Sequence, residues 1–116
     1  MPRETYSGKR RDFISSHEIS FKIHRRGNEV VLAACDVELL GKRWKDGKRR
    51  LSSPKSFYCD ETTPDPDELV NIMETCTQAN VIGEHAIKAF ITGGFINSDS
   101  VYKIEGVPYA IFVRMI

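Results

Sequence analysis

The chain has 116 residues, of which 41% are hydrophobic and 28% charged; these values are typical of one globular domain and exclude a wholly disordered protein. No apolar run approaches the roughly 20 residues of a membrane-spanning helix, and the polar N-terminus lacks the apolar segment of a signal peptide. We therefore expect a cytoplasmic protein without a membrane partner.

The net charge of +1 conceals an asymmetry between the two halves of the chain. Residues 1–55 carry 14 Lys/Arg against 7 Asp/Glu, whereas residues 56–116 carry 3 Lys/Arg against 9 Asp/Glu. Such an asymmetry indicates an interaction surface, often for nucleic acid.

Residues 1–18 contain few large apolar side chains and the basic run Lys9, Arg10 and Arg11. A segment with so little to bury is expected to be a flexible basic arm. The folded domain is predicted to span residues 19–116.

The first elements are predicted to be two strands that form a β-hairpin. Ile19, Phe21 and Ile23 alternate with polar residues, and a second apolar strand over residues 29–35 follows the turn at Gly27 and Asn28. Asp36 is predicted to cap a short helical turn over residues 37–40, which Gly41 ends.

Residues 42–50 combine basic residues with one aromatic ring around Asp46-Gly47, a strong signal for a hairpin with a type I′ turn. Lys and Arg neutralise phosphates, and a Trp ring offers a face on which an unpaired base stacks. The alternative is a solvated basic hairpin in which Trp44 packs inward beside Leu39. The nucleic-acid-binding candidates are Lys42, Arg43, Trp44, Lys45, Lys48, Arg49 and Arg50, together with Lys9, Arg10 and Arg11 of the arm.

Two helices are predicted in the second half of the chain. Residues 51–58 are expected to add one or two short strands, and residues 61–66 a loop. Asp65 is a suitable N-cap and Pro66 a suitable first residue for the first helix. The apolar stripes of the two helices are Leu69, Ile72, Met73 and Cys76, then Ile82, Ala86, Ile87, Phe90 and Ile91, ended by Gly93 and Gly94.

Residues 101–104 and 109–116 are predicted to be paired strands around the turn at residues 105–108. The order of strands, helices and strands predicts an α+β fold. We expect a mostly antiparallel sheet of about five or six strands, with two consecutive helices packed on one face. The final strand is a candidate sheet edge, and the oligomeric state is left open.

Several stretches resemble an archaeal family catalogued as domain of unknown function 424 (DUF424). The resemblance rests on residues 35–42, 56–58, 79–84 and 106–108, whose order and spacing agree with the family across roughly residues 19–116. It implies an archaeal origin and an association with translation genes, but no established activity. Tyr109 stands where the family commonly has a histidine, which implies that a catalytic role for that histidine is missing here.

Three residues at the junction of the predicted helices, Asn80, Gly83 and Glu84, form a candidate polar pocket. The alternative is a helix–helix junction that Asn80 caps. Cys35 has no histidine at an obvious catalytic spacing, and the His and Cys residues lack the close pairs of a zinc site. We therefore predict no catalytic residue, no cofactor and no metal ion.

Three functional hypotheses remain. The first is a non-enzymatic RNA-binding accessory protein of the ribosome or translation machinery, with ribosomal RNA, tRNA or ribosomal proteins as partners. The second is a protein–protein adaptor subunit in a larger complex. The third is an enzyme that uses a pocket near Asn80 and Glu84.

Overall fold

The computed structural model describes residues 18–114, so the basic run Lys9, Arg10 and Arg11 lies outside the described residues. Within these residues, one six-stranded sheet and one two-stranded sheet form with three α-helices, which confirms the α+β class. No helix among them is long and apolar enough to cross a membrane.

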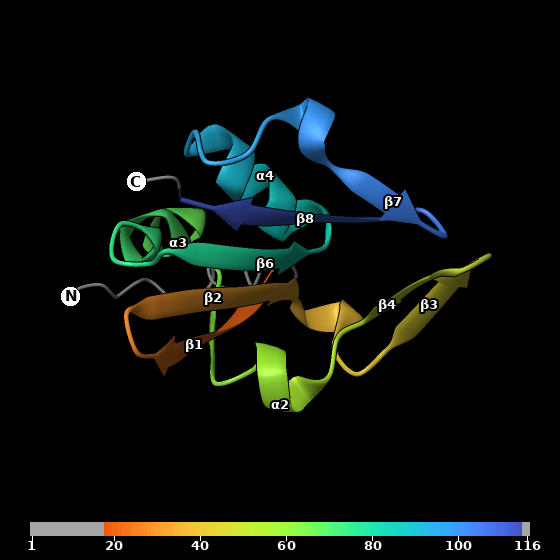
Figure 1. Cartoon of the computed structure of the whole chain (residues 1–116), viewed down its shortest axis with the longest axis horizontal. Helices are drawn as coiled ribbons and strands as arrows, with labels where there is room; N and C mark the ends of the chain where they lie inside the picture. Colours follow the sequence, from red (N-terminus) through yellow and green to blue (C-terminus); the bar gives the residue numbers. More distant parts are fainter. Residues whose placement is uncertain (1–17, 115–116) are drawn as a thin grey trace, which may run out of the picture.

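The large sheet is mixed, with strand order β5-β1-β2-β6-β8-β7 (Figure 1). Four of its neighbouring pairs are antiparallel, and only β2 and β6 run parallel, so the mostly antiparallel prediction is confirmed. Its strands are β1 (Ile19–Arg26), β2 (Glu29–Asp36), β5 (Glu61–Thr63), β6 (Gln78–Ile82), β7 (Tyr102–Ile104) and β8 (Val107–Val113).

Both longer helices, α3 (Pro66–Met73) and α4 (Glu84–Thr92), lie on one face of this sheet (Figure 1). The α3 start is as predicted: Asp65 accepts a hydrogen bond from the backbone N–H of Asp67 at 2.9 Å, and Pro66 is the first helical residue. The main core between helices and sheet includes Phe21, Leu32, Leu69, Met73, Val81, Ala86, Phe90 and Ala110.

A smaller core lies on the opposite face of the sheet. The hairpin of β3 (Arg43–Asp46) and β4 (Arg49–Ser52), the 3-10 helix η3 (Val37–Leu39) and the short helix α2 (Lys55–Tyr58) cover part of that face (Figure 1). This small core consists of Ala33, Cys35, Tyr58 and Ile82, against which Leu39, Leu40, Trp44, Leu51, Phe57, Val107 and Tyr109 pack.

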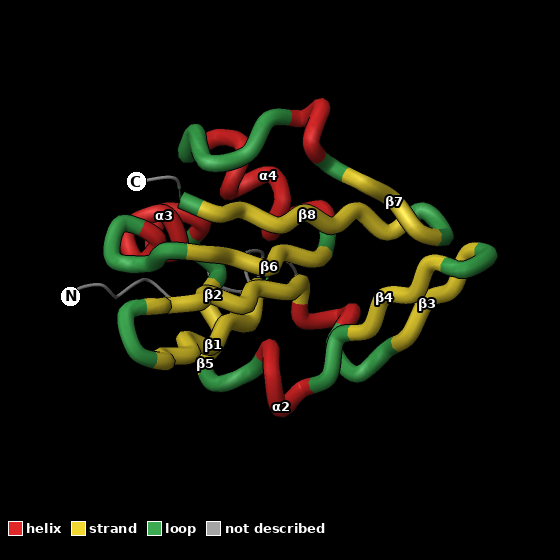
Figure 2. The backbone as a smooth tube through the Cα atoms, viewed as in Figure 1, coloured by secondary structure: helices red, strands yellow, loops and turns green. Residues whose placement is uncertain are grey.

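Several predictions about individual helices and strands were wrong. Residues 78–82 form strand β6 between the two helices, so Asn80 does not cap a helix–helix junction. Residues 55–58 are helical, and residues 61–63 form the short strand β5 beside β1 rather than a loop (Figure 2). The last strand, β8, is not an edge, because it lies between β6 and β7.

Candidate functional site

The β3–β4 hairpin presents three cations on one face. Its register places Lys45 opposite Arg50 and Arg43 opposite Ser52, and because side chains alternate along a strand these four share one face. Arg43, Lys45 and Arg50 are exposed and line a hollow of about 580 Å³. Glu105 of the β7–β8 turn lines the same hollow, as do Trp44, Leu51 and Ser52 of the hairpin.

The opposite face of the hairpin anchors it to the domain. Trp44 is half-buried and packs with Leu51 against the small core, which favours the inward packing over a fully exposed stacking platform. The Arg49 guanidinium donates to the Asp46 carboxylate at 3.1 Å and to the Lys103 carbonyl at 2.9 Å.

Two further hydrogen bonds hold the hairpin. The backbone N–H of Lys45 donates to the Glu105 carboxylate at 2.8 Å, which links β3 to the β7–β8 turn, and that of Lys42 donates to Ser53 Oγ at 3.1 Å across the base of the hairpin. Lys48 is exposed in the turn beside Gly47, the central residue whose φ is positive at 64°. A type I′ turn requires positive φ at both central residues, here Gly47 and Lys48, and the φ of Lys48 is not positive. The turn is therefore not the predicted type I′.

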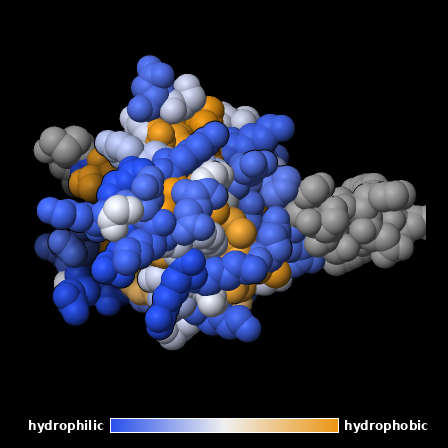
Figure 3. Space-filling model, turned by 90° about the vertical axis from the view of Figure 1, so that its right-hand side faces the viewer, coloured by the Kyte–Doolittle hydropathy of each residue, from blue (hydrophilic) through white to orange (hydrophobic). Residues whose placement is uncertain are grey.

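The remaining described arginine pair of the basic half, Arg25 and Arg26, does not join this surface. It lies at the β1–β2 turn, at the end of the sheet away from the β3–β4 hairpin (Figure 1). Hydrophilic side chains predominate over the hairpin end of the molecule (Figure 3). The sequence candidates of residues 42–50 therefore form a local surface that excludes Arg25 and Arg26.

A second cluster lies where the parallel strands β2 and β6 end. Asp36, the last residue of β2, accepts hydrogen bonds from the backbone N–H groups of His85 at 3.0 Å and Ala86 at 2.9 Å. Its side chain thus caps α4 and makes no cap hydrogen bond to η3, contrary to the prediction. Asp36 is only 2% exposed, and burial raises its pKa although the two N–H groups oppose that shift.

Gly83 makes this approach of Asp36 to the helix sterically feasible. Gly83 has φ of +109°, and a Cβ at this position would overlap the carboxyl group of Asp36. Its backbone N–H donates to the Pro108 carbonyl at 2.8 Å. Three of the four stretches that carry the family resemblance therefore meet at this point, through Asp36, Gly83 and Pro108.

Asp36 is also close to Glu38 and His85. One potential ligand atom from each residue lies within 4.8 Å of the others. Two carboxylates and an imidazole at this spacing are a combination that could hold a metal ion. The sequence analysis missed it because Asp36 and His85 are 49 positions apart, and only the parallel pairing of β2 with β6 brings them together.

The residues of the candidate polar pocket diverge in space. Asn80 is half-buried in β6, beside Ala33 of β2 and Ile111 of β8, on the face opposite the long helices. Glu84 begins α4 and lines a shallow hollow with Ile87 and Pro108. Asn80 does not line that hollow.

Cys35 is poorly suited to nucleophilic catalysis. Burial and the neighbouring Asp36 raise the pKa of its thiol to about 12, so the thiolate is scarce near neutral pH. His24 faces Val31 across the hairpin instead of Cys35, and its ring stacks on Phe57 with centroids 4.3 Å apart.

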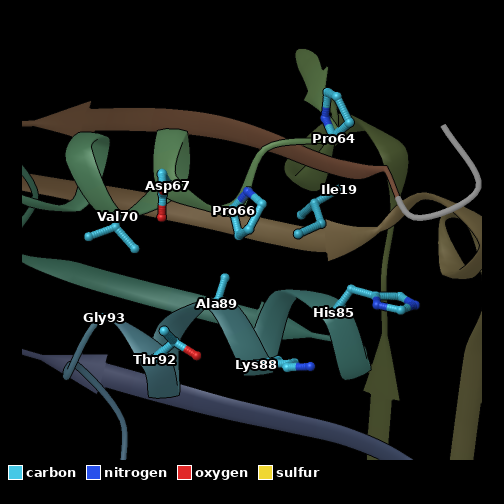
Figure 4. Close-up of a pocket in the computed structure, with 10 residues that line it drawn as sticks. All are labelled: Ile19, Pro64, Pro66, Asp67, Val70, His85, Lys88, Ala89, Thr92 and Gly93. Atoms are coloured by element: carbon cyan, nitrogen blue, oxygen red, sulfur yellow. The ribbon is translucent and has the colours of Figure 1, made fainter. Parts of the chain in front are cut away.

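A groove of about 410 Å³ lies between α3 and α4, with an apolar floor that includes Ile19, Pro66 and Ala89. Figure 4 shows His85 at one end of this groove, with its ring extending away from Ala89 and Thr92. His85 therefore borders the groove while its ring approaches the Asp36 cluster.

An apolar strip is exposed on the sheet face that the long helices leave uncovered. Tyr102 is 60% exposed, Ile111 66% and Val113 53%. Register places these three side chains on the same face of β7 and β8, where the Tyr102 and Tyr109 rings pair with centroids 5.8 Å apart.

Comparison with known proteins identifies a family and a structural relative but no activity. The family model described as "Protein of unknown function (DUF424)" matches residues 24–115. The crystal structure of an uncharacterised conserved protein from Methanopyrus kandleri is similar with a TM-score of 0.70 and 26% identity, covering 85% of this chain and 95% of that one. No curated protein matches the chain.

Proposed function

The chain belongs to the DUF424 family, whose description leaves its function open. We propose that this member is a non-enzymatic RNA-binding accessory protein of the translation machinery. The observation that carries the proposal is the outer face of the β3–β4 hairpin, where Arg43, Lys45 and Arg50 converge on one hollow. The partner would be a structured ribosomal RNA or tRNA.

The spacing of these cations suits a phosphate backbone. Lys45 and Arg50 are directly opposite on adjacent strands, where Cβ atoms are about 5 Å apart, so both charges act on the same short stretch of backbone. Each neutralised phosphate releases counterions, which makes affinity fall steeply with salt. The hairpin is anchored through Arg49, Trp44 and the backbone of Lys45, which limits the ordering cost of binding.

Because Trp44 packs inward, we propose that the hairpin contacts mainly the RNA backbone. The Trp44 ring borders the hollow but packs against the small core, so only part of it is open to a base, and recognition would depend on phosphates and helix shape more than on base identity. We accordingly expect tighter binding to structured RNA than to single strands.

The test is fluorescence anisotropy of the full chain, freed of nucleic acid, with labelled structured RNA, single-stranded RNA and duplex DNA over a range of salt. Replacing Arg43, Lys45 and Arg50 by Ala should weaken RNA binding and reduce the log–log salt slope by about 2 to 3, close to one unit for each phosphate that is no longer neutralised. The matched control is Arg25→Ala with Arg26→Ala, which removes two exposed cations at the other end of the sheet.

Two results would count against RNA binding. One is the absence of binding to any of the three probes at low salt. The other is an equal loss of slope per charge in the Arg25/Arg26 control, which would indicate nonspecific attraction to net positive charge.

A second candidate function, a protein–protein adaptor, rests on the strip of Tyr102, Ile111 and Val113. Exposed apolar side chains that adjoin one another are typical of protein-binding surfaces. A photo-crosslinking residue at position 111 should then capture one defined partner, and Val113→Lys should abolish the capture while leaving RNA anisotropy unchanged. Capture that persists in Val113→Lys would contradict the adaptor proposal.

A further inference from the structure

We propose that Asp36, Glu38 and His85 bind a divalent first-row transition-metal ion at the end of the parallel strands β2 and β6. The three residues come from the end of β2, from η3 and from the first turn of α4. Their potential ligand atoms all lie within 4.8 Å of one another. Ligands about 2.0–2.2 Å from one ion are themselves about 3–4 Å apart, so small side-chain rotations would complete the geometry.

Asp36 retains the capacity to act as a ligand while it caps α4. An ionised carboxylate has about four acceptor positions, and the N–H groups of His85 and Ala86 use one on each oxygen. The glycine at position 83 lets the carboxylate lie against the backbone, which fixes its orientation. Hydrogen-bonded carboxylates held in this way are typical of pre-organised metal ligands.

The other two proposed ligands, Glu38 and His85, are less buried than Asp36 and leave the site accessible to an ion. Glu38 is exposed on a single turn of 3-10 helix, so its carboxylate has room to move toward an ion, and His85 is half-buried. A buried, a half-buried and an exposed ligand together form a site that is open to solvent on one side. Water would therefore occupy the remaining coordination positions.

The donor set indicates the class of ion. Two carboxylates and one neutral imidazole carry a charge of about −2 and so balance a dication. Imidazole suits Zn²⁺, Co²⁺ and Fe²⁺, while the carboxylates also suit Mn²⁺; Ca²⁺ and Mg²⁺ prefer oxygen ligands alone. An ion here would also neutralise the charge of the buried Asp36, whose exposed fraction is 2%.

The test is calorimetric titration of the full chain with Co²⁺, Zn²⁺, Mn²⁺ and Mg²⁺, with the visible spectrum of bound Co²⁺ as a second readout. Cys59, which is half-buried, is replaced by Ser throughout, so that an accessible thiolate does not compete for the ion. Asp36 is left unchanged because it caps α4. His85→Ala and Glu38→Gln should each lower Co²⁺ affinity by about a hundredfold or more, because loss of a residue that merely supports a ligand already costs about 10–100-fold.

Two variants serve as matched controls. His24→Ala removes an imidazole from the other side of the domain, and Glu84→Gln removes a carboxylate from the same helix end but outside the three-residue cluster. Both should leave Co²⁺ affinity unchanged, and Mg²⁺ should bind far more weakly than Co²⁺.

The proposal is overturned if none of the transition ions binds saturably, or if the control variants weaken binding as much as His85→Ala does. Circular dichroism of each apo variant separates loss of a ligand from loss of folding. The site does not depend on RNA binding, because its residues lie outside the β3–β4 hairpin and its readout uses metal alone.

Discussion

The contact between Asp36 and Gly83 explains why two short stretches far apart in the sequence need particular residue types. Position 36 must be acidic, because the two N–H groups at the start of α4 donate to different carboxylate oxygens of Asp36, and position 83 must lack a side chain to admit that carboxylate. Because the carboxylate is buried, its own hydrogen bonds are the main compensation for its lost hydration. This contact thus connects the end of β2 to the start of α4.

Gly83→Ala should destabilise the protein strongly. A Cβ would overlap the Asp36 carboxyl group, and φ of +109° is unfavourable for alanine, so we expect a loss of about 3–5 kcal/mol in the free energy of unfolding. The measurement is urea denaturation followed by circular dichroism. Gly94→Ala is the control: its φ is +85° but nothing lies within 4 Å of a Cβ, so about 1–2 kcal/mol is expected. Equal losses in the two variants would contradict a role for the Asp36 contact.

Asp36 should make stability depend on pH. Its pKa is raised in the folded state above the ordinary 3.8, so the folded state binds this proton more tightly than the unfolded state does. The Asp36 contribution is therefore fully present below pH 3.8 and is lost as pH rises through the higher folded pKa. Asn does not titrate, so Asp36→Asn does not lose this contribution as the pH rises. Its free energy of unfolding, measured by urea denaturation, should therefore increase relative to that of the parent between about pH 4 and pH 7. A constant difference would contradict the raised pKa.

At the scale of elements, the helices and hairpins that begin or turn at characteristic residues could be predicted from the sequence. Asp65 and Pro66 marked the start of α3, and the Gly27-Asn28 and Asp46-Gly47 turns marked two hairpins. Strand β6 was missed because Val81 and Ile82 directly precede the apolar stripe of α4, and a short apolar run does not distinguish a strand from a helix. The side on which Arg43, Lys45 and Arg50 lie followed only from the observed register.

The β3–β4 hairpin should depend on Trp44 for its docking. Trp44 is the largest side chain that joins the hairpin to the small core, so Trp44→Ala should cost about 2 kcal/mol and raise hydrogen exchange across residues 43–52. Exchange in β2 and β6 should change little, since Leu32 and Val81 belong to the main core. Arg43→Ala, which alters only the outer face, is the control and should stay within about 0.5 kcal/mol of the parent. Unchanged exchange in the hairpin of Trp44→Ala would show that other contacts hold it.

At the scale of the molecule, the parallel pairing of β2 with β6 determines where chemistry is available. It places the carboxyl ends of both strands beside the N-terminus of α4 and brings Asp36 to His85. Long-range pairing leaves no periodic signal in the sequence, so local reasoning found the basic hairpin but not the Asp36–Glu38–His85 cluster. The two proposed sites therefore differ in origin. The cations of the hairpin are close together in the sequence, whereas Asp36 and His85 meet only in the folded domain.

The arrangement of the whole sheet predicts a monomer. Both edge strands, β5 and β7, have three residues, which leaves little edge for pairing with a second copy. Sedimentation equilibrium at about 10 µM, a concentration at which a dimer of micromolar Kd would be populated, should give the 13.2 kDa of one chain. A dimer that Val113→Lys dissociates would show instead that the strip is a self-association surface, and the adaptor proposal would lose the observation on which it rests.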